Sequence, residues 1–306
     1  QRQRPRRRDG RGAGGRIMTA TLFDPRICEL GEGAFWHPER GQPFWFDIHG
    51  RRLLSRLDGQ ELEWRFDEKA SAMGWIDRDR VLVATETALR CLDLSDGALT
   101  LVAPLEADRP DTRSNDGRAD PMGGFWIGTM AHDAAPGQGA IYRYFRGELR
   151  KLRGNVSIPN AICFAPDGRL AYFADTAAQT VWRQALDENG WPAAEAEVFL
   201  DLTGTDQHPD GAVTDAQGRF WNARWGSGAV VCHAPDGQVL HRLHLPPAQA
   251  SCPAFIGPAL DRLLVTSAAE GLAPDPLAPD SDRQDGSTWL LDPEGARGRP
   301  EPRVLL

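Results

Sequence analysis

The chain has 306 residues, and 41 % of them are hydrophobic, which is enough to bury the core of one large domain or two small ones. The formal net charge is −8, of which residues 1–17 contribute +6, so the rest of the chain carries roughly −14. This negative charge is unfavourable for binding the nucleic-acid backbone, so we expect no nucleic-acid partner. No stretch approaches the 18 continuous apolar residues of a transmembrane helix, so we expect no membrane partner either.

The chain begins with a basic segment, QRQRPRRRDGRGAGGRI, which contains seven Arg and one Asp. No apolar stretch follows it, so it is not typical of a secretory signal. Such a segment could bind a polyanion, but a disordered leader or a translation artefact is the simpler interpretation, with the true start at Met18. We therefore expect one folded domain over residues 18–306.

The five cysteines are scattered and odd in number. They stand at positions 28, 91, 163, 232 and 252, with no CxxC pair among them. This pattern argues against a disulfide framework or a zinc–thiolate site and favours a reducing compartment. We expect a cytoplasmic protein that is a monomer or a weak homodimer.

One kind of apolar run recurs six times and predicts a strand in each of six units. The runs are FWFDI, VLVAT, FWIGT, AYFAD, FWNAR and LLVTS, at residues 44–48, 81–85, 125–129, 171–175, 220–224 and 263–267. Their starts are 37, 44, 46, 49 and 43 residues apart, and each run follows a turn sequence. This spacing is typical of an all-β fold, the six-bladed β-propeller with four antiparallel strands per blade. A β-sandwich is the alternative, but six copies are too many for one.

The tripeptide Pro-Asp-Gly, an ordinary turn sequence, occurs three times. Asp167 and Asp236 each stand between two predicted strands of one blade, so we expect hairpin turns there. Asp210 differs, because its unit already has a hairpin turn at Asp215–Gly218. We therefore place Asp210 at the entry of the innermost strand of its blade, which lines the central channel of a propeller.

Polar residues occupy this entry position in four of the six units. In chain order the position holds Glu32, Ala72, Asn115, Asn160, Asp210 and Cys252. Junctions between loops and strands favour Asp and Asn in any fold, but four in register are more than that preference explains. Two carboxylates and two amides that converge at one mouth of the channel form a hard, oxygen-rich set, which suits Ca²⁺, Mg²⁺ or Mn²⁺.

In these stretches the chain resembles the SMP-30/gluconolactonase family, to which regucalcin and the bacterial sugar lactonases belong. The similarity runs from about Leu30 to Pro293. It rests on the motifs LGEGAFWHPERGQPFWFDI, RSNDGRADPMGGFWIGTM, NAICFAPDGRLAYFADT, HPDGAVTDAQGRFWNARWGSG and CPAFIGPALDRLLVTSA, which are weak singly but specific in this order and spacing. The resemblance implies a six-bladed propeller with one divalent cation in its channel, Ca²⁺ in the first place, with Zn²⁺, Mg²⁺, Mn²⁺ or Fe²⁺ as alternatives.

The resemblance also implies roles for individual residues. The cation ligands of the family map onto Glu32, Asn160 and Asp210. Its substrate contacts map onto Arg113 and Asn115, and a further one, just after Gly-Thr-Met, maps onto Asp133.

Two departures from the family pattern stand beside the implied ligands. Where relatives commonly have Asn-Gly, this chain has Asn160-Ala161, and where many have Gly-Pro it has Gly33-Ala34. Neither change removes a ligand. The altered sequence around Asp133 bears on which sugar is preferred more than on whether the site is active.

These residues lead us to expect a metal-dependent lactonase that opens a sugar lactone to the aldonic acid. The metal polarises the carbonyl of the cyclic ester, and Asp210, as the catalytic base, takes the proton of the attacking water. The alternatives are a non-enzymatic calcium-binding protein of the regucalcin type, a promiscuous esterase or organophosphate hydrolase, and a protein-binding platform. No GxSxG elbow is present, which argues against a serine hydrolase.

Several other residues have a structural and a functional interpretation. Asp116 is either a residue beside the site or a turn residue, and His208 is expected in an exposed loop. Trp75 and Trp225 are the candidates for pocket walls, whereas three tryptophans that recur at one blade position are expected in the core: Trp45, Trp126 and Trp221. The Pro- and Asp-rich segment 270–285 is expected to form a mobile loop or lid.

Overall fold

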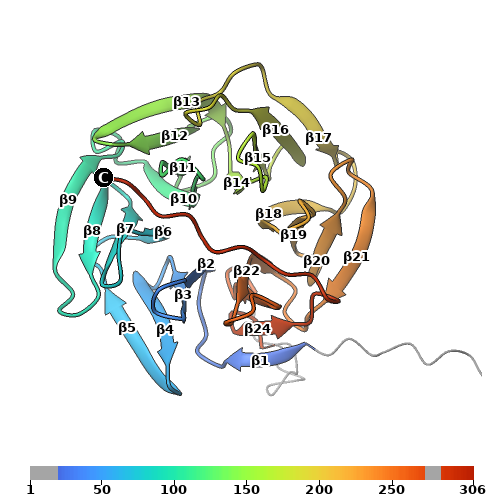
Figure 1. The fold of residues 1–306 in the computed structure, drawn as a ribbon, viewed down its shortest axis with the longest axis horizontal. Coiled ribbons are helices and arrows are strands. Elements are labelled where there is room, and N and C mark those ends of the chain that lie inside the picture. The colour runs from blue at the N-terminus through green and yellow to red at the C-terminus, as the bar shows by residue number, and fades with distance from the viewer. Residues whose placement is uncertain (1–19, 273–283) are drawn as a thin grey trace, which may run out of the picture.

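The computed structural model describes residues 20–272 and 284–306, so the Arg-rich leader and most of segment 270–285 lie outside the described residues. Within these ranges the fold is all-β, with six four-stranded antiparallel sheets arranged around a central channel (Figure 1). The predicted six-bladed β-propeller is therefore confirmed. No helix long and apolar enough to cross a membrane is found in the described part of the chain.

Each of the first three blades runs from an inner strand at the channel to an outer strand at the rim. Blade 1 consists of β2 (Gly31–His37), β3 (Gln42–Asp47), β4 (Arg52–Leu57) and β5 (Gln60–Arg65). Blade 2 consists of β6 (Ala70–Trp75), β7 (Arg80–Thr85), β8 (Ala88–Asp93) and β9 (Leu99–Pro104). Blade 3 consists of β10 (Thr112–Ala119), β11 (Phe125–Ala131), β12 (Gly139–Phe145) and β13 (Glu148–Val156).

The remaining blades repeat this order, and the last one closes the ring. Blade 4 consists of β14 (Pro159–Phe164), β15 (Leu170–Asp175), β16 (Thr180–Ala185) and β17 (Glu197–Asp201). Blade 5 consists of β18 (His208–Thr214), β19 (Phe220–Trp225), β20 (Ala229–His233) and β21 (Val239–His244). Blade 6 consists of β22 (Ala250–Ile256), β23 (Arg262–Ser267), β24 (Thr288–Leu291) and β1 (Thr21–Asp24), so that a strand from the start of the chain joins three from its end.

The six recurring apolar runs form the second strand of each blade. These strands are buried along nearly their whole length because neighbouring blades cover both of their faces. The hydrophobic clusters accordingly join adjacent blades rather than filling single ones. The three recurring tryptophans have at most 1 % of their surface exposed, which confirms core packing for Trp45, Trp126 and Trp221.

Two of the three Pro-Asp-Gly sequences form hairpin turns and the third does not, as predicted. Gly168 and Gly237 close hairpin turns between strands of one blade, with φ of 71° and 91°. Asp210, by contrast, lies inside the inner strand β18, and a side chain at Gly211 would approach the backbone oxygen of Ser251 in the next blade to 2.8 Å. The third sequence is therefore part of the channel wall rather than a turn.

Every inner strand has a β-bulge or irregularity in its pairing near the entry to the channel. The register shifts between Glu32 and Phe35 in β2, and between Asn160 and Cys163 in β14. The equivalent shifts occur in β6, β10, β18 and β22. Because a bulge bends a strand and redirects its side chains, this repeated irregularity turns residues of several blades toward one point.

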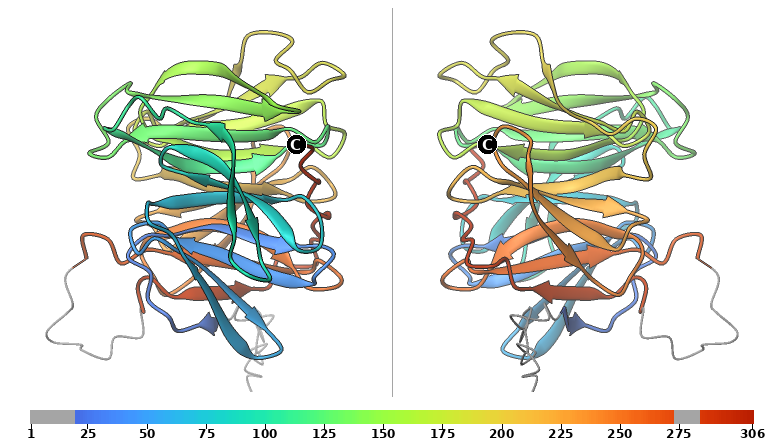
Figure 2. Two further views of the ribbon diagram at one scale, coloured as in Figure 1. Left: turned by 90° about the vertical axis from the view of Figure 1, so that its left-hand side faces the viewer. Right: turned by 90° about the vertical axis from the view of Figure 1, so that its right-hand side faces the viewer.

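The C-terminal segment crosses the face of the propeller opposite the start of the inner strands (Figures 1 and 2). Within residues 292–306, backbone amides donate to the carbonyls of Leu260 in blade 6 and Trp75 in blade 2. Glu301 forms an ion pair with Arg118 on an inner strand, and both side chains are about nine-tenths buried. This segment covers one end of the channel and leaves the other end for a site.

Candidate functional site

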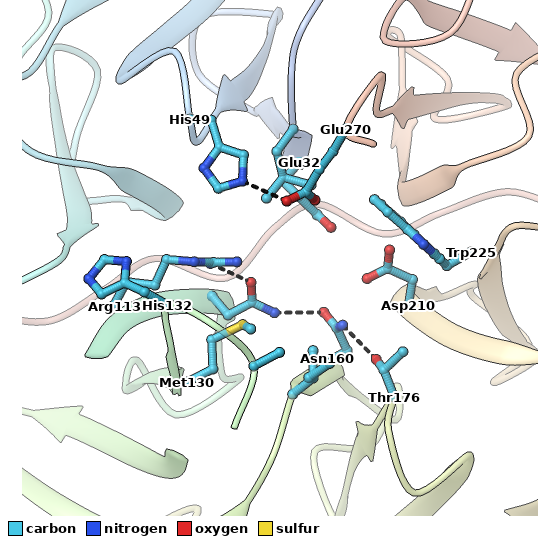
Figure 3. Close-up of a pocket in the computed structure, with 14 residues that line it drawn as sticks. Glu32, His49, Arg113, Met130, His132, Asn160, Thr176, Asp210, Trp225 and Glu270 are labelled. Atoms are coloured by element: carbon cyan, nitrogen blue, oxygen red, sulfur yellow. Dashed lines mark hydrogen bonds and ion pairs between the residues drawn. The ribbon is translucent and has the colours of Figure 1, made fainter. Parts of the chain in front are cut away.

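Four polar side chains from four inner strands line a cavity of about 210 Å³ at the channel mouth (Figure 3). Glu32 comes from β2, Asn115 from β10, Asn160 from β14 and Asp210 from β18, and each is at most 6 % exposed. Arg113 from β10 lines the same cavity. The structure therefore brings together five of the six site residues predicted from the sequence.

The backbone after Glu32 and after Asn160 has an unusual conformation. Gly33 and Ala161 have φ values of 58° and 57°, in the left-handed region that disfavours residues with a side chain. Ala161 thus adopts, with a side chain, a conformation that glycine adopts without steric cost. With Ala rather than Gly after it, Asn160 still lines the cavity.

A chain of hydrogen bonds fixes the two amides. Asn115 donates from Nδ2 to Oδ1 of Asn160 over 3.2 Å and to the backbone oxygen of Pro159 over 3.0 Å. Asn160 donates from Nδ2 to the hydroxyl of Thr176 at 2.8 Å, and that hydroxyl donates to the backbone oxygen of Pro209. Because Nδ2 of Asn160 donates to Thr176, Oδ1, which accepts from Asn115, is the acceptor atom that Asn160 presents at the cavity.

The two carboxyl groups of the site are buried close to one another. Burial raises the pKa of Glu32 to about 8, with repulsion from Asp116 as the next cause. Burial also raises the pKa of Asp210 well above its ordinary value, with repulsion from Glu32 next. Within the described residues neither carboxyl group forms an ion pair, and the nearest cation is Arg113, which lines the same cavity and whose charge lowers the pKa of Glu32.

Asp116 lies below these carboxylates and links two blades. It is 7 % exposed, and it accepts hydrogen bonds from the backbone amides of Gly117 at 2.9 Å and Ile162 at 2.7 Å. Burial raises its pKa to about 6. Asp116 therefore connects the inner strands of blades 3 and 4 beside the cavity. The structure supports its interpretation as a residue beside the site rather than a turn residue.

Arg113 provides a buried cation at the cavity wall. Its Nη1 donates to Oδ1 of Asn115 at 2.8 Å and to the backbone oxygen of Ser114 at 2.9 Å. Its Nε is buried without a protein partner in the described residues. Burial lowers the pKa of the guanidinium, and the charge of Glu270 is the largest effect in the opposite direction. Arg113 thus has donors left for a ligand in the cavity.

Asp133 lies apart from the other five residues. It is exposed, its Oδ1 accepts a hydrogen bond from the amide of Ala135 at 3.0 Å, and it does not line the cavity. The neighbouring His132 lines the cavity instead, with its Nδ1 3.2 Å from Nζ of Lys69. The proposed contact between Asp133 and substrate stays a prediction.

Of the two tryptophans predicted to form pocket walls, Trp225 lines the cavity and Trp75 does not. Trp225 ends the second strand of blade 5, and this strand runs toward the mouth, so its side chain lines the cavity (Figure 3). Trp75 ends the first strand of blade 2, which runs away from the mouth. It donates from Nε1 to the backbone oxygen of Glu301 on the opposite face. The direction of each strand therefore decides which tryptophan reaches the cavity.

The sequence analysis missed several cavity residues, among them His49, Met130, Ile158, Thr176 and Glu270. His49 follows β3 and Glu270 follows β23, so both come from connections after second strands. Such connections meet at the same mouth as the starts of the inner strands, and this topological rule could have pointed to them. Their distance of 221 positions along the chain gave no local signal for the contact between them.

The donor set fits a hard divalent cation. No cluster of three His, Cys, Asp or Glu side chains with metal-binding geometry occurs in the described residues. The candidate set instead combines the carboxylates of Glu32 and Asp210 with Oδ1 of Asn160. Oxygen ligands of this kind suit Ca²⁺ and similar ions, and a cation would relieve the repulsion between two buried carboxylates.

The fold and this cavity define a six-bladed propeller with an oxygen-rich site at one mouth of its channel. A sequence profile described as "SMP-30/Gluconolactonase/LRE-like region" matches residues 30–269. The chain therefore belongs to the SMP-30/gluconolactonase/LRE-like family, as its motifs indicated.

The similarity to known proteins covers nearly the whole chain. The chain is 38 % identical to an L-arabinolactonase of Azospirillum brasilense, with 85 % of this chain and 88 % of the relative covered. It is 36 % identical to pentonolactonase XacC of Haloferax volcanii, with 94 % and 98 % covered. Its structure is similar to that of a calcium-binding protein, regucalcin, from Agrobacterium tumefaciens, with a TM-score of 0.90, 42 % identity and 94 % and 98 % covered.

Proposed function

We propose that this protein is a divalent-metal-dependent hydrolase of sugar lactones, which opens the cyclic ester to the aldonic acid. The observation that carries the proposal is the cavity itself, where two buried carboxylates and an amide oxygen lie beside an arginine with free donors. The relatives named as lactonases support the same reaction. A site for calcium storage alone would not need Arg113 and Asn115.

In this proposal Glu32, Asn160 and Asp210 hold the cation, Ca²⁺ in the first place. A bound divalent cation supplies a Lewis acid for the lactone carbonyl and makes a bound water more acidic. Because Ca²⁺ acidifies water least of the candidate ions, the protein must provide a base, and Asp210 is that base.

Arg113 and Asn115 orient the lactone. The planar guanidinium presents paired donors to neighbouring hydroxyl or carbonyl oxygens of the sugar. Asn115 engages Nη1 of Arg113 through its Oδ1, so the guanidinium is held at a fixed angle before substrate enters. Such pre-organisation reduces the entropy lost when the substrate binds.

The experiment that tests this function is hydrolysis of a panel of aldonolactones by metal-stripped protein at constant pH. Ca²⁺, Mg²⁺, Mn²⁺, Zn²⁺ and Fe²⁺ are added back singly, and the midpoint of thermal unfolding is followed in parallel as a measure of ion binding. We expect turnover well above the spontaneous rate with at least one ion. An ion that raises the unfolding midpoint without supporting turnover of any lactone contradicts the proposal and favours a calcium-binding role.

The proposed setting of the enzyme is a reducing cytoplasm, where it acts as a monomer or a weak homodimer on a small-molecule substrate. All five cysteines are free thiols, which supports a reducing compartment. Size-exclusion chromatography with light scattering tests the oligomeric state.

A further inference from the structure

A histidine–glutamate pair forms part of the cavity wall above the proposed metal ligands. Nε2 of His49 lies 3.0 Å from Oε1 of Glu270, and both residues line the cavity (Figure 3). The histidine is largely covered, with 17 % of its side chain exposed, while 45 % of the Glu270 side chain is exposed. Within the described ranges Glu270 has no second protein partner, so its other carboxylate oxygen is available to a ligand.

The backbone holds this pair in a fixed place between blades 1 and 6. The amide of Glu270 donates to the backbone oxygen of Glu29 at 2.9 Å, and the amide of Ile48, next to His49, donates to that of Leu30 at 2.9 Å. Both residues are therefore attached to the segment that leads directly into β2 and Glu32. Backbone hydrogen bonds thus connect the pair to the segment that places Glu32, a proposed metal ligand.

The charge of Glu270 faces the cavity at neutral pH. The hydrogen bond from His49 lowers the pKa of the carboxyl group, so the group is ionised. The cations that face this carboxylate are Arg113 and Lys69. Among the acidic groups, Glu270 raises the pKa of Arg113 the most. An anionic substituent that enters beside Glu270 would therefore meet a carboxylate on the same cavity wall.

We propose that Glu270, positioned by His49, makes the site selective for neutral polyhydroxy lactones over lactones that carry a carboxylate or a sulfonate. The free oxygen of Glu270 accepts a hydrogen bond from a hydroxyl group of a neutral lactone. An anionic substituent has no proton to donate and is repelled in a partly buried site, so rejection and recognition come from the same group. The inference rests on the proposed lactonase function and names the substrate class within it.

The test compares gluconolactone with glucarolactone of the same ring size, which differ only in a terminal hydroxymethyl group or carboxylate. The readout is the ratio of kcat/KM for the two compounds, or of their inhibition constants against the best neutral lactone where a compound is not turned over. The wild-type protein should prefer the neutral compound by at least tenfold. Glu270→Gln should narrow that preference by about tenfold, because the amide no longer repels the carboxylate.

Two further variants separate this role from a general effect of charge or of local structure. His49→Leu removes the partner that orients the carboxylate and should narrow the preference less than Glu270→Gln does. The matched control is Glu197→Gln, which removes the same charge from an ion pair with Arg183 on the outer strand β17. This control should leave the preference at the wild-type value.

The possible results distinguish failure of the inference from failure of the function. An equal preference for both compounds in the wild type, or an unchanged ratio in Glu270→Gln, overturns the selectivity while the lactonase function stands. A loss of more than a hundredfold in kcat for both compounds at an unchanged ratio would make Glu270 an acid–base group and likewise overturns it. Absence of turnover and binding for every lactone contradicts the function itself.

Discussion

Asn115 donates a hydrogen bond from its side-chain amide to Oδ1 of Asn160 over 3.2 Å and so joins the inner strands of blades 3 and 4 at the cavity. The same side chain accepts from Arg113 through Oδ1. A residue assigned to the substrate and a residue assigned to the cation are thus parts of one buried network. In such a network, loss of one member affects the others.

Asn115→Ala should therefore lower both stability and activity. It leaves the backbone oxygen of Pro159 and Nη1 of Arg113 short of buried partners, which costs about 1–3 kcal/mol in the free energy of unfolding. We expect kcat/KM to fall about a hundredfold because Arg113 loses its support. Urea unfolding and steady-state kinetics on the same preparation measure the two effects.

A matched control is Gln184→Ala in blade 4. Gln184 is buried too, and its amide donates to the backbone oxygens of Ala185 and Ala194, away from the cavity. It should lose comparable stability and keep its kcat/KM. If Asn115→Ala also keeps kcat/KM, then Asn115 has only a structural role.

Asp210→Asn should abolish turnover and yet stabilise the metal-free protein. The amide cannot accept the proton of the attacking water, so kcat should fall by a factor of about a thousand or more. Removing one of two adjacent buried carboxylates also removes repulsion, which should add about 1–2 kcal/mol to the free energy of unfolding without metal. Asp167→Asn makes the same change in the same tripeptide at a hairpin turn and is the control. A loss of only a few-fold in kcat would contradict the role of Asp210 as base and ligand.

The strand pattern and the channel residues could be predicted from the sequence because both follow from a repeat. The run FWFDI and its five counterparts recur because each second strand is covered on both faces by neighbouring blades. Glu32, Asn160 and Asp210 stand out because they occupy one position of that repeat. The repeated sequence pattern thus predicts both the six blades and the three proposed metal ligands.

The walls of the cavity could not be predicted in the same way. His49 and Glu270 lie in connections, where no periodicity marks a contact between residues far apart in the chain. Trp75 and Trp225 each end a strand, and the opposite directions of these strands place one tryptophan on the far face and the other at the cavity. The exposed position of Asp133 follows from its own turn with Ala135, a local preference that a motif comparison does not register.

Gly33 and Ala161 share one backbone conformation but should respond differently to mutation. A Cβ atom at Gly33 would lie 2.5 Å from the backbone oxygen of Ser71 and 2.8 Å from Cδ2 of Phe46. Gly33→Ala should therefore cost about 2–4 kcal/mol in the free energy of unfolding and displace Glu32. Chemical unfolding measures the cost, and the affinity for the activating ion reports the displacement.

Ala161→Gly is the converse change at the second position. It relieves about 1–2 kcal/mol of left-handed strain, but it removes a buried methyl group worth about 0.8 kcal/mol and adds about 0.5–1 kcal/mol of backbone entropy to the unfolded chain. These effects nearly cancel, so stability should change by less than about 1 kcal/mol. A large gain in stability would show that Ala161 is held under more strain than its conformation indicates.

His37 should make the protein less stable in mild acid. Its Nδ1 accepts from the amide of Arg40 at 3.3 Å, so Nε2 carries the proton and donates to the backbone oxygen of Asp77 at 3.0 Å. Burial lowers the pKa of this imidazole to about 4, and His233 is lowered to about 4 by burial as well. Both histidines are therefore neutral in the folded protein where they are already charged in the unfolded chain.

The sign of the pH effect follows from this difference in proton uptake. Below the ordinary histidine pKa of about 6.5, these two histidines bind protons in the unfolded chain and not in the folded protein, so their contribution to the free energy of unfolding falls as the pH drops toward 4. Each histidine contributes on the order of 1–3 kcal/mol to this fall. His37→Gln keeps a donor for Asp77 but cannot be protonated, so between pH 7 and pH 4.5 the free energy of unfolding of this variant, measured in urea, should fall by about 1–3 kcal/mol less than that of the wild type. The exposed His208→Gln should keep the wild-type slope; an equal slope in the His37 variant would mean that His37 takes up its proton without loss of the folded state.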